Sequence, residues 1–373
     1  MTTPTELRVL QFCHGYDGPF LDCARQYASL FVGTPYKVTT VYLTGAPSVE
    51  VERGSASDEV VFLDYRSRDV RGLKLKAIRD IKRLVAGRNF KFCIAHRFKP
   101  IYVALLGTDL PVIGVHHGFG DYQRLSRKLF ANCLRKRLAL LGVSNAVRDE
   151  IRACLPSWPA ERIETLYNRI DIAAVQAEQV CRDDARAHLG LPQDAWVVGN
   201  VGRLHPDKDQ ATLIRGFAQA LPQLPAGSLL AIMGSGRLES SLKALAAELG
   251  VSASVRFLGQ VPQGRRYFKA FDVFALTSDH EPFGMVLLEA MAAGVPLICS
   301  DCGGGREVVE GVGRLFALAD RAALASQLRA QALAAQPSAD QQEVAFSRLQ
   351  ACFSDASVVR RFWTLPLVTG LRA

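Results

Sequence analysis

Short apolar runs alternate with amphipathic stretches along the whole chain. The runs have the length of buried strands, and the stretches between them carry apolar residues at helical spacing. In the first half, strands are expected at 7–12, 36–43, 60–63, 92–95 and 112–116, with helices near 20–30, 72–85 and 122–140. Strands that alternate with helices in this way predict an α/β fold built on a parallel sheet.

The same alternation returns after a break near Asn168, where a polar helix over 171–189 is expected to follow a hinge. In the second half, strands are expected at 196–201, 229–233, 255–258, 273–276 and 296–300, with helices near 210–220, 238–249, 264–271, 284–293, 321–335 and 341–363. A chain of 373 residues is long enough for two domains. We therefore predict two Rossmann-like, doubly wound domains, 1–172 and 173–340, that face each other across a cleft, with 341–373 as a closing segment.

The expected helix 284–293 is apolar on every side except at Glu289, which is typical of a buried helix. A glutamate is rarely buried without a partner, and no Lys or Arg lies one helical turn away from it. Two interpretations stay open: a carboxylate at the lip of the cleft that binds a polyhydroxyl ligand, or a buried Glu bonded to the protein's own backbone.

Arg203 and Lys208 lie five residues apart in a loop that follows an expected strand. A guanidinium and an ammonium that converge on one anion suit a diphosphate; the alternative is a solvated loop with unrelated charges. The amides of Phe283, Gly284 and Met285 begin the apolar helix, where free N–H groups favour phosphate or sugar oxygens. The same reasoning applies to Gly18, although an ordinary turn is equally consistent with it.

Other candidate chemistry is weaker. His116 and His117 end an expected strand, and we predict one as a polar contact in the cleft and the other as a structural hydrogen bonder. Asp207-Lys208-Asp209 matches the Asp-x-Asp of metal-dependent sugar transferases, but we interpret it as loop and helix cap and expect no divalent metal. Cys299 and Cys302 lack a second pair, which favours two free thiols over a zinc site.

The net charge of +9 is concentrated in one region. Residues 66–137 carry 18 Lys and Arg against 4 Asp, so the rest of the chain is net negative. The expected helix 122–140 combines an apolar stripe with many basic residues, which predicts an anionic membrane surface as a partner. The alternative is a solvated helix whose apolar stripe faces the core.

The chain shows no apolar run long enough to span a membrane and no secretory signal, and its nine cysteines are scattered. We therefore expect a cytoplasmic protein that lies peripherally on the cytoplasmic face of the inner membrane. A nucleic-acid-binding protein is a weak alternative, because the basic region lacks an aromatic stacking motif and leaves Glu281 and Glu289 unexplained; we expect no nucleic acid partner.

The spacing from Glu281 to Glu289 resembles the E-x7-E signature of retaining glycosyltransferases of family 4, which have the GT-B fold. The resemblance covers essentially the whole chain and is strongest in the second half. It extends to Gly202-Arg203 with Lys208, to the Gly234-Ser235-Gly236 turn, to the strand 255–259 ahead of the base-binding loop, and to Val143-Ser144 and Asn168-Arg169-Ile170-Asp171.

The resemblance implies transfer of a sugar from a nucleotide diphosphate sugar, with UDP as the family-level expectation, to a hydroxyl of a glycan or lipid-linked acceptor. It suggests a role in cell-surface polysaccharide or lipopolysaccharide synthesis, without a cofactor. Glu281 and His117 would act at the transferred sugar, Glu289 at the ribose, and Arg203 and Lys208 at the diphosphate. The remaining donor contacts implied are Gly18, Gly234, Val261, Phe283, Gly284 and Met285.

Two departures from the family pattern are visible. The first-domain loop reads Gly15-Tyr16-Asp17-Gly18-Pro19 rather than a Gly-Gly pair, and Arg169 replaces a glycine. If position 169 requires a positive φ, an arginine there costs free energy and the local turn differs. A sugar-nucleotide epimerase of similar architecture is the main alternative, since it would bind the same donor without an acceptor.

Overall fold

The computed structural model describes residues 6–334 and 339–370. The chain forms two compact units: unit 1 runs to Asn168 and resumes at Val359, and unit 2 is Arg169–Val358. The sequence pattern predicts the first boundary at 172 and a separate closing segment from 341 on. Residues 341–358 instead group with unit 2, and only those from 359 on group with unit 1.

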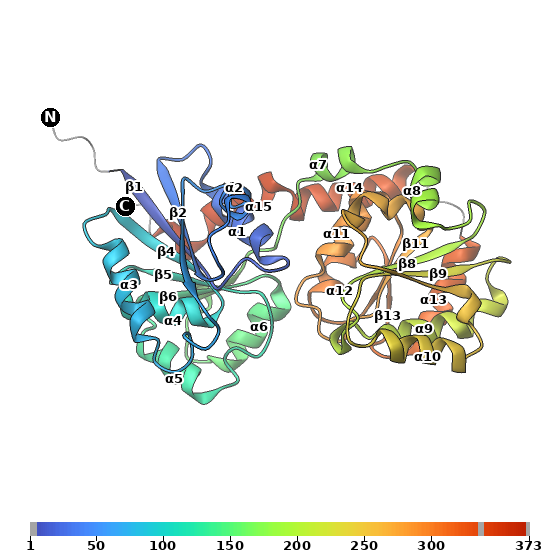
Figure 1. Ribbon diagram of the computed structural model, residues 1–373, viewed down its shortest axis with the longest axis horizontal. Helices are drawn as coiled ribbons and strands as arrows, with labels where there is room; N and C mark the ends of the chain where they lie inside the picture. The colour runs from blue at the N-terminus through green and yellow to red at the C-terminus, as the bar shows by residue number, and fades with distance from the viewer. Residues whose placement is uncertain (1–5, 335–338, 371–373) are drawn as a thin grey trace. The chain divides into compact units, whose positions relative to one another are not determined.

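Unit 1 contains a seven-stranded parallel sheet in the order β3-β2-β1-β4-β5-β6-β7, with helices packed around it (Figure 1). The strands are β1 Leu7–Cys13, β2 Tyr36–Thr44, β3 Glu59–Tyr65, β4 Phe90–His96, β5 Val112–His116, β6 Leu138–Gly142 and β7 Ile163–Thr165. The helices are α1 Phe20–Ala28, α2 Val49–Gly54, α3 Leu75–Val85, α4 Phe98–Gly107, α5 Leu125–Cys133, α6 Asn145–Cys154 and α16 Pro366–Thr369. Every residue of β5 and β6 is buried, as expected for central strands covered on both faces.

Unit 2 contains a six-stranded parallel sheet in the order β10-β9-β8-β11-β12-β13. The strands are β8 Val197–Val201, β9 Leu229–Met233, β10 Val255–Gly259, β11 Val273–Leu276, β12 Leu297–Ser300 and β13 Arg314–Phe316. The helices are α7 Ile172–Glu178, α8 Arg182–Leu189, α9 Gln210–Ala220, α10 Glu239–Glu248, α11 Met285–Ala292, α12 Gly303–Val309, α13 Arg321–Leu333 and α14 Ala339–Phe353, with the 3-10 helix η6 Gly264–Ala270; α15 Asp355–Thr364 crosses the unit boundary. These two sheets confirm the predicted α/β class and doubly wound architecture.

The strand order of each sheet has a switch point. In unit 1 the chain moves outward from β1 and returns to β4 on its other side; in unit 2, β8 and β11 have the same relation. Ligands of open α/β sheets bind at the carboxyl ends of the strands beside such a switch point. The loops after β1, β4, β8 and β11 are therefore where functional side chains are expected.

The expected helix 122–140 is wrong in extent. Helix α5 covers only Leu125–Cys133, Tyr122 is buried ahead of it, and Leu138–Gly142 forms the central strand β6. The run Leu-Ala-Leu-Leu-Gly contains no polar residue, and burial on both sheet faces decides such a sequence in favour of a strand. Leu125 and Leu129 are 69% and 56% exposed, so the stripe that they form is not core.

The expected helix 171–189 is two helices, α7 and α8, separated at Gln179–Cys181. The Gln179 side chain donates to the Arg265 carbonyl at 2.7 Å, and the Val180 amide donates to the Arg266 carbonyl at 3.1 Å. These bonds to η6 draw the backbone out of helical geometry. Arg169 does not have a positive φ, so the arginine carries no left-handed backbone strain; it is buried and pairs with Asp355 at 3.3 Å.

The end of the described chain packs against unit 1. The indole Nε1 of Trp363 donates to the Leu30 carbonyl at 3.0 Å, and its ring stacks on Tyr36. Arg361 pairs with Glu164 at 3.3 Å. Helix α15 thus contacts Tyr36 of β2 and Glu164 of β7, two strands that are far apart in sequence. No helix within residues 6–334 and 339–370 is long and apolar enough to cross a bilayer.

Candidate donor site

Three loops at the carboxyl edge of the unit 2 sheet are tied together by backbone hydrogen bonds. The Gly202 amide donates to the Met233 carbonyl at 2.9 Å, and the Gly234 amide donates to the Gly259 carbonyl at 2.7 Å. Gly234 has a φ of +139°, and a Cβ there would lie 1.9 Å from the Gly202 carbonyl oxygen. Only glycine fits this position, which keeps the ends of β8, β9 and β10 close enough to frame one pocket.

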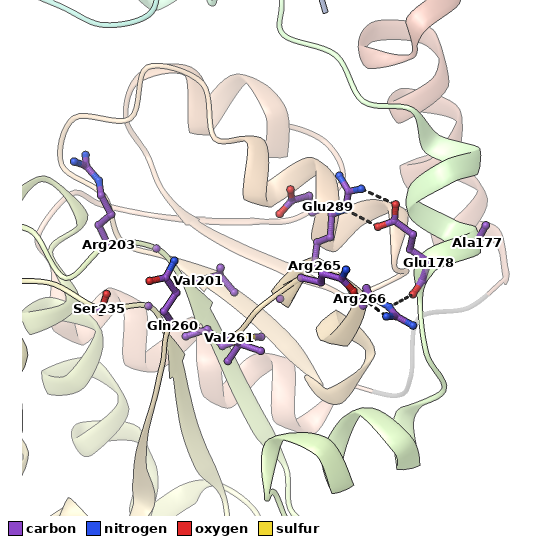
Figure 2. Close-up of a pocket in the computed structure, with 15 residues that line it drawn as sticks. Ala177, Glu178, Val201, Arg203, Ser235, Gln260, Val261, Arg265, Arg266 and Glu289 are labelled. Atoms are coloured by element: carbon purple, nitrogen blue, oxygen red, sulfur yellow. Dashed lines mark hydrogen bonds and ion pairs between the residues drawn. The ribbon is translucent and has the colours of Figure 1, made fainter. Parts of the chain in front are cut away.

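That pocket has a volume of about 1020 Å³ and opens at the ends of these strands (Figure 2). Four residues predicted from the sequence line it: Arg203, Gly234, Val261 and Glu289. Figure 2 shows Arg203 on one side of the pocket, with Arg265 and Arg266 on the other. The other lining residues are Ala177, Glu178, Val201, Gly202, Met233, Ser235, Gln260, Gln263 and Gly264. Five segments that are distant in sequence therefore meet where a nucleotide diphosphate has room to bind.

The two glutamates of the signature lie in different environments. Glu281 is the buried one, 6% exposed, and its Oε2 accepts from Lys208 Nζ at 2.7 Å and from Ser278 Oγ at 3.0 Å. Its carbonyl accepts from the Gly304 amide at 2.8 Å, and a Cβ on Gly303 would lie 2.3 Å from that carbonyl oxygen. A buried carboxylate is tolerated here because an ammonium and a hydroxyl both satisfy it.

Glu289 is half-buried and belongs to the pocket wall. Helix α11 begins after Gly284, whose φ is +95°, and it buries Leu287 and Leu288. Phe283 is buried and packs edge-on against Phe353 at 5.8 Å. The helix is therefore anchored by its apolar face while Glu289 is presented to the pocket. Lys208, Glu281, Phe283, Gly284 and Met285 are not among the lining residues.

Sequence reasoning missed a charged group on the pocket wall. Glu178 accepts from Arg265 Nε and Nη2, each at 2.6 Å, and its carbonyl accepts from Arg266 Nε at 3.2 Å. Arg266 also donates to the Gln263 side chain at 2.9 Å. The doublet Arg265-Arg266 directly after a Gln-Gly turn was a usable signal, but it was hidden inside an expected helix.

The predicted residues of unit 1 lie at the ends of its central strands. His117 follows β5, and its Nε2 lies 3.0 Å from Nδ1 of His96, with the two rings stacked. Burial, followed by the charges of His116 and Arg97, lowers the pKa of His117 to about 3, so its imidazole is neutral near pH 7. His116 is fully buried and pairs with Asp121 at 2.8 Å. Gly18, with a φ of +59°, precedes α1.

The Asp-x-Asp match lies inside the cationic loop. Asp207 bonds to His205 and lies 3.5 Å from Arg203, while Asp209 caps α9 by accepting from the Thr212 amide. Across the residues that the structure describes, no three His, Cys, Asp or Glu side chains gather as metal ligands. Metal independence stays a prediction. Cys299 and Cys302 are both free thiols.

Two family descriptions match the two halves of the chain. "Glycosyltransferase Family 4" matches residues 24–174, and "Glycosyl transferases group 1" matches residues 182–341. The chain belongs to the family 4 glycosyltransferases. This family and its GT-B fold are those that the sequence predicted.

Solved structures of similar fold superpose on nearly the whole length of this chain. A glycosyltransferase of Rickettsia africae superposes with a TM-score of 0.84 at 15% identity, covering 99% of both chains. Anabaena HepE in complex with UDP and glucose superposes with a TM-score of 0.76 at 21% identity, covering 95% of this chain and 98% of that one. At such identities the likeness establishes the fold alone.

Curated relatives match over shorter stretches. An uncharacterized glycosyltransferase of Methanocaldococcus jannaschii is 33% identical over 178 residues, which are 46% of this chain and 44% of the relative. A lipopolysaccharide core biosynthesis glycosyltransferase of Rhizobium meliloti is 42% identical over 113 residues, or 30% of this chain and 32% of the relative. The chain thus spans less than half the length of these relatives.

Proposed function

We propose that the protein transfers a sugar from a nucleotide diphosphate sugar, with UDP as the nucleotide, to an acceptor hydroxyl with retention of anomeric configuration. The observation that carries the proposal is the meeting of Arg203, Gly234, Val261 and Glu289 in one pocket. HepE, of the same fold, was solved with UDP and with UDP-glucose, which supports the choice of base.

In this proposal Glu289 accepts hydrogen bonds from the ribose hydroxyls, and Val261 and Gly234 contact the nucleoside. Arg203 and Lys208 stabilise negative charge on the departing diphosphate, as preorganised cations do in a site with little water. Glu281 fixes Lys208 through its 2.7 Å ion pair and offers its second oxygen to the sugar. The amides of Phe283, Gly284 and Met285 at the start of α11 hold sugar oxygens.

The roles of Gly18 and His117 stay predictions that rest on the family resemblance. A neutral His117 can donate or accept a hydrogen bond to a sugar hydroxyl without adding charge. Exchange of His117 for Ala is expected to lower transfer while leaving UDP binding in unit 2 unchanged.

The test of the donor site is a thermal-shift panel of nucleotide sugars followed by a transfer assay. A ligand at one hundred times its Kd stabilises the protein by about 2.7 kcal/mol. Glu289→Gln should weaken UDP binding by roughly tenfold or more, because a charge-assisted hydrogen bond to ribose is lost. Unchanged UDP affinity in this variant would refute the assignment of Glu289, and donor isomerisation without transfer would favour an epimerase.

For the acceptor we propose a glycan or lipid-linked molecule of the cell surface, reached from the cytoplasmic side of the inner membrane. The relatives include proteins named for lipopolysaccharide core biosynthesis and for D-inositol 3-phosphate. The exposed Leu125 and Leu129, with Lys128 on α5 and Arg124 directly before it, form a basic and apolar face suited to an anionic bilayer. Flotation with phosphatidylglycerol vesicles should fail for the double variant Leu125→Asp, Leu129→Asp; equal flotation would refute this surface.

A further inference from the structure

Unit 1 contains a group of basic side chains that the donor site does not use. Arg97 and Lys99 flank the start of α4, directly after the central strand β4, and Arg71 and Lys74 lie just ahead of α3. We call Arg71, Lys74, Arg97 and Lys99 the cationic cluster. Every residue that lines the donor pocket belongs to unit 2, so the cluster is a separate set.

Aromatic rings hold the cluster in place. The Arg97 guanidinium lies over the Phe20 ring at 4.6 Å from its centroid, and Lys74 Nζ lies over the Tyr102 ring at 4.6 Å. Phe98, between Arg97 and Lys99 in sequence, contacts Tyr102 and carries Arg127 on its face. Lys74 Nζ also donates to the Gly72 carbonyl at 2.7 Å, which leaves two of its three ammonium donors. Contacts with aromatic faces fix the direction of a cation without using its hydrogen-bond donors.

The charge of the cluster is not balanced by nearby acids. Arg127, beside it, pairs with Asp121, but none of the four cluster residues forms an ion pair with a carboxylate in the described ranges. Burial and the neighbouring charges of Lys99 and Arg127 lower the pKa of Lys74, and burial with the charges of Arg97, Arg71 and Arg127 lowers that of Lys99. His14, which follows β1, is affected as well: burial and the charges of Lys99 and Arg97 lower its pKa. The mutual repulsion would be relieved by a bound anion.

The backbone of Arg97 gives an independent observation. Its φ of +72° and ψ of 163° lie in a region that is nearly confined to glycine. An arginine that is kept in such a conformation at the carboxyl end of a central strand indicates a side chain retained for what it binds. The position is also beside the switch point of the sheet, where a ligand is expected.

We propose that the cationic cluster binds a phosphate group carried by the acceptor. This inference rests on the proposed transferase function and names the chemistry of its acceptor. Four neighbouring cations exceed what one carboxylate can neutralise, whereas a phosphate offers up to two charges and several acceptor oxygens to a guanidinium fork and ammonium groups. The phosphate can belong to a soluble sugar phosphate or to a lipid headgroup.

The test measures binding of glycerol 3-phosphate to the full chain by calorimetry, with UDP saturating the donor site and glycerol as the uncharged probe. The double variant Arg97→Gly, Lys99→Gln removes two cluster charges, and glycine suits the backbone at 97. It should bind glycerol 3-phosphate at least about tenfold more weakly, because two charge-assisted contacts are lost. Its thermal midpoint should be no lower than that of the wild type.

The matched control is Arg79→Gln, Lys82→Gln, which removes two exposed charges from α3 outside the cluster. It should stay within about twofold of the wild type, since distant charges are screened by salt. Two outcomes would refute the phosphate site without touching the proposed function. One is an equal loss of binding in the control variant, and the other is a wild-type protein that UDP stabilises but that does not bind glycerol 3-phosphate. Failure of UDP to stabilise the wild type would instead count against the proposed function.

Vesicles distinguish the two sources of phosphate. If the cluster variant also loses binding to vesicles of phosphatidic acid in phosphatidylcholine, the site takes a lipid headgroup. If it loses glycerol 3-phosphate but keeps the vesicles, the site takes a soluble phosphate. Either result supports phosphate recognition, and retention of both by the variant refutes it.

Discussion

The two units have the same parallel sheet architecture but differ in whether their charged side chains have ion-pair partners. In unit 2 the charged groups near the pocket are paired: Lys208 with Glu281 at 2.7 Å and Arg265 with Glu178 at 2.6 Å. In unit 1 the cationic cluster has no carboxylate partner in the described ranges, and the adjacent His117 is neutral. Ion pairs hold the side chains of a pocket in place before a ligand binds. Cations without a carboxylate partner are instead neutralised by the ligand itself.

The largest expected effect comes from breaking a pair in unit 2. Glu281→Ala leaves the Lys208 ammonium, 19% exposed, without its carboxylate. Removal of one partner of a buried pair costs about 3–5 kcal/mol of the free energy of unfolding. Urea denaturation measures it, with Glu239→Gln as control because the Lys243–Glu239 pair is exposed and should contribute less than about 1 kcal/mol. Equal effects of the two substitutions would contradict the contrast between buried and surface pairs.

An intermediate effect is expected from pH in unit 1. The folded pKa of His117, about 3, lies below its unfolded value of 6.5, so the unfolded state binds more protons between these values. The contribution of His117 is fully present above pH 6.5 and is lost as the pH falls, by about 2 kcal/mol at pH 5. Thermal midpoints of the wild type and of His117→Asn, compared from pH 7.5 to 5, should converge. Parallel curves would show that His117 is not held neutral by the fold.

The smallest effect is expected at the pocket rim. Arg265 and Glu178 have side chains that are 39% and 37% exposed, so solvent screens their attraction. Arg265→Gln should change the free energy of unfolding by no more than about 1 kcal/mol. A loss comparable to that of Glu281→Ala would mean that the rim pair is structural rather than a surface feature of the pocket.

The sequence predicted correctly those strands whose hydrophobic pattern fits only one kind of element. Strands β5, β9 and β11 begin and end where expected, because runs of apolar residues between turns fit only a strand covered on both faces. Strands β6, β7 and β13 were missed. The first directly follows the basic Arg135-Lys136-Arg137 run, and the other two have only three residues each, too few for a periodicity.

The environments of Glu281 and Glu289 show what a local sequence pattern cannot predict. The apolar neighbours of Glu289 on its helix left two interpretations open, a carboxylate at the lip of a cleft or a buried one bonded to the protein's own backbone. Glu289 is only half-buried because it lines the pocket. The shape of the pocket depends on the close approach of Gly234, which follows β9, to Gly202, which follows β8. Glu281 is buried by contacts that its own segment does not reveal, with Lys208 and with Gly303 and Gly304 of α12. Such contacts between distant segments leave no local signal.

The contact of Trp363 with Leu30 makes unit 1 discontinuous in sequence, whereas unit 2 is one continuous segment. During synthesis on the ribosome, unit 2 can close as soon as its own residues emerge. Unit 1 is translated first yet must wait for residues 359–370 to cover the aromatic surface around Phe31 and Tyr36. The nascent chain therefore completes unit 2 before unit 1, and the aromatic surface beside the first sheet stays uncovered until residues 359–370 emerge.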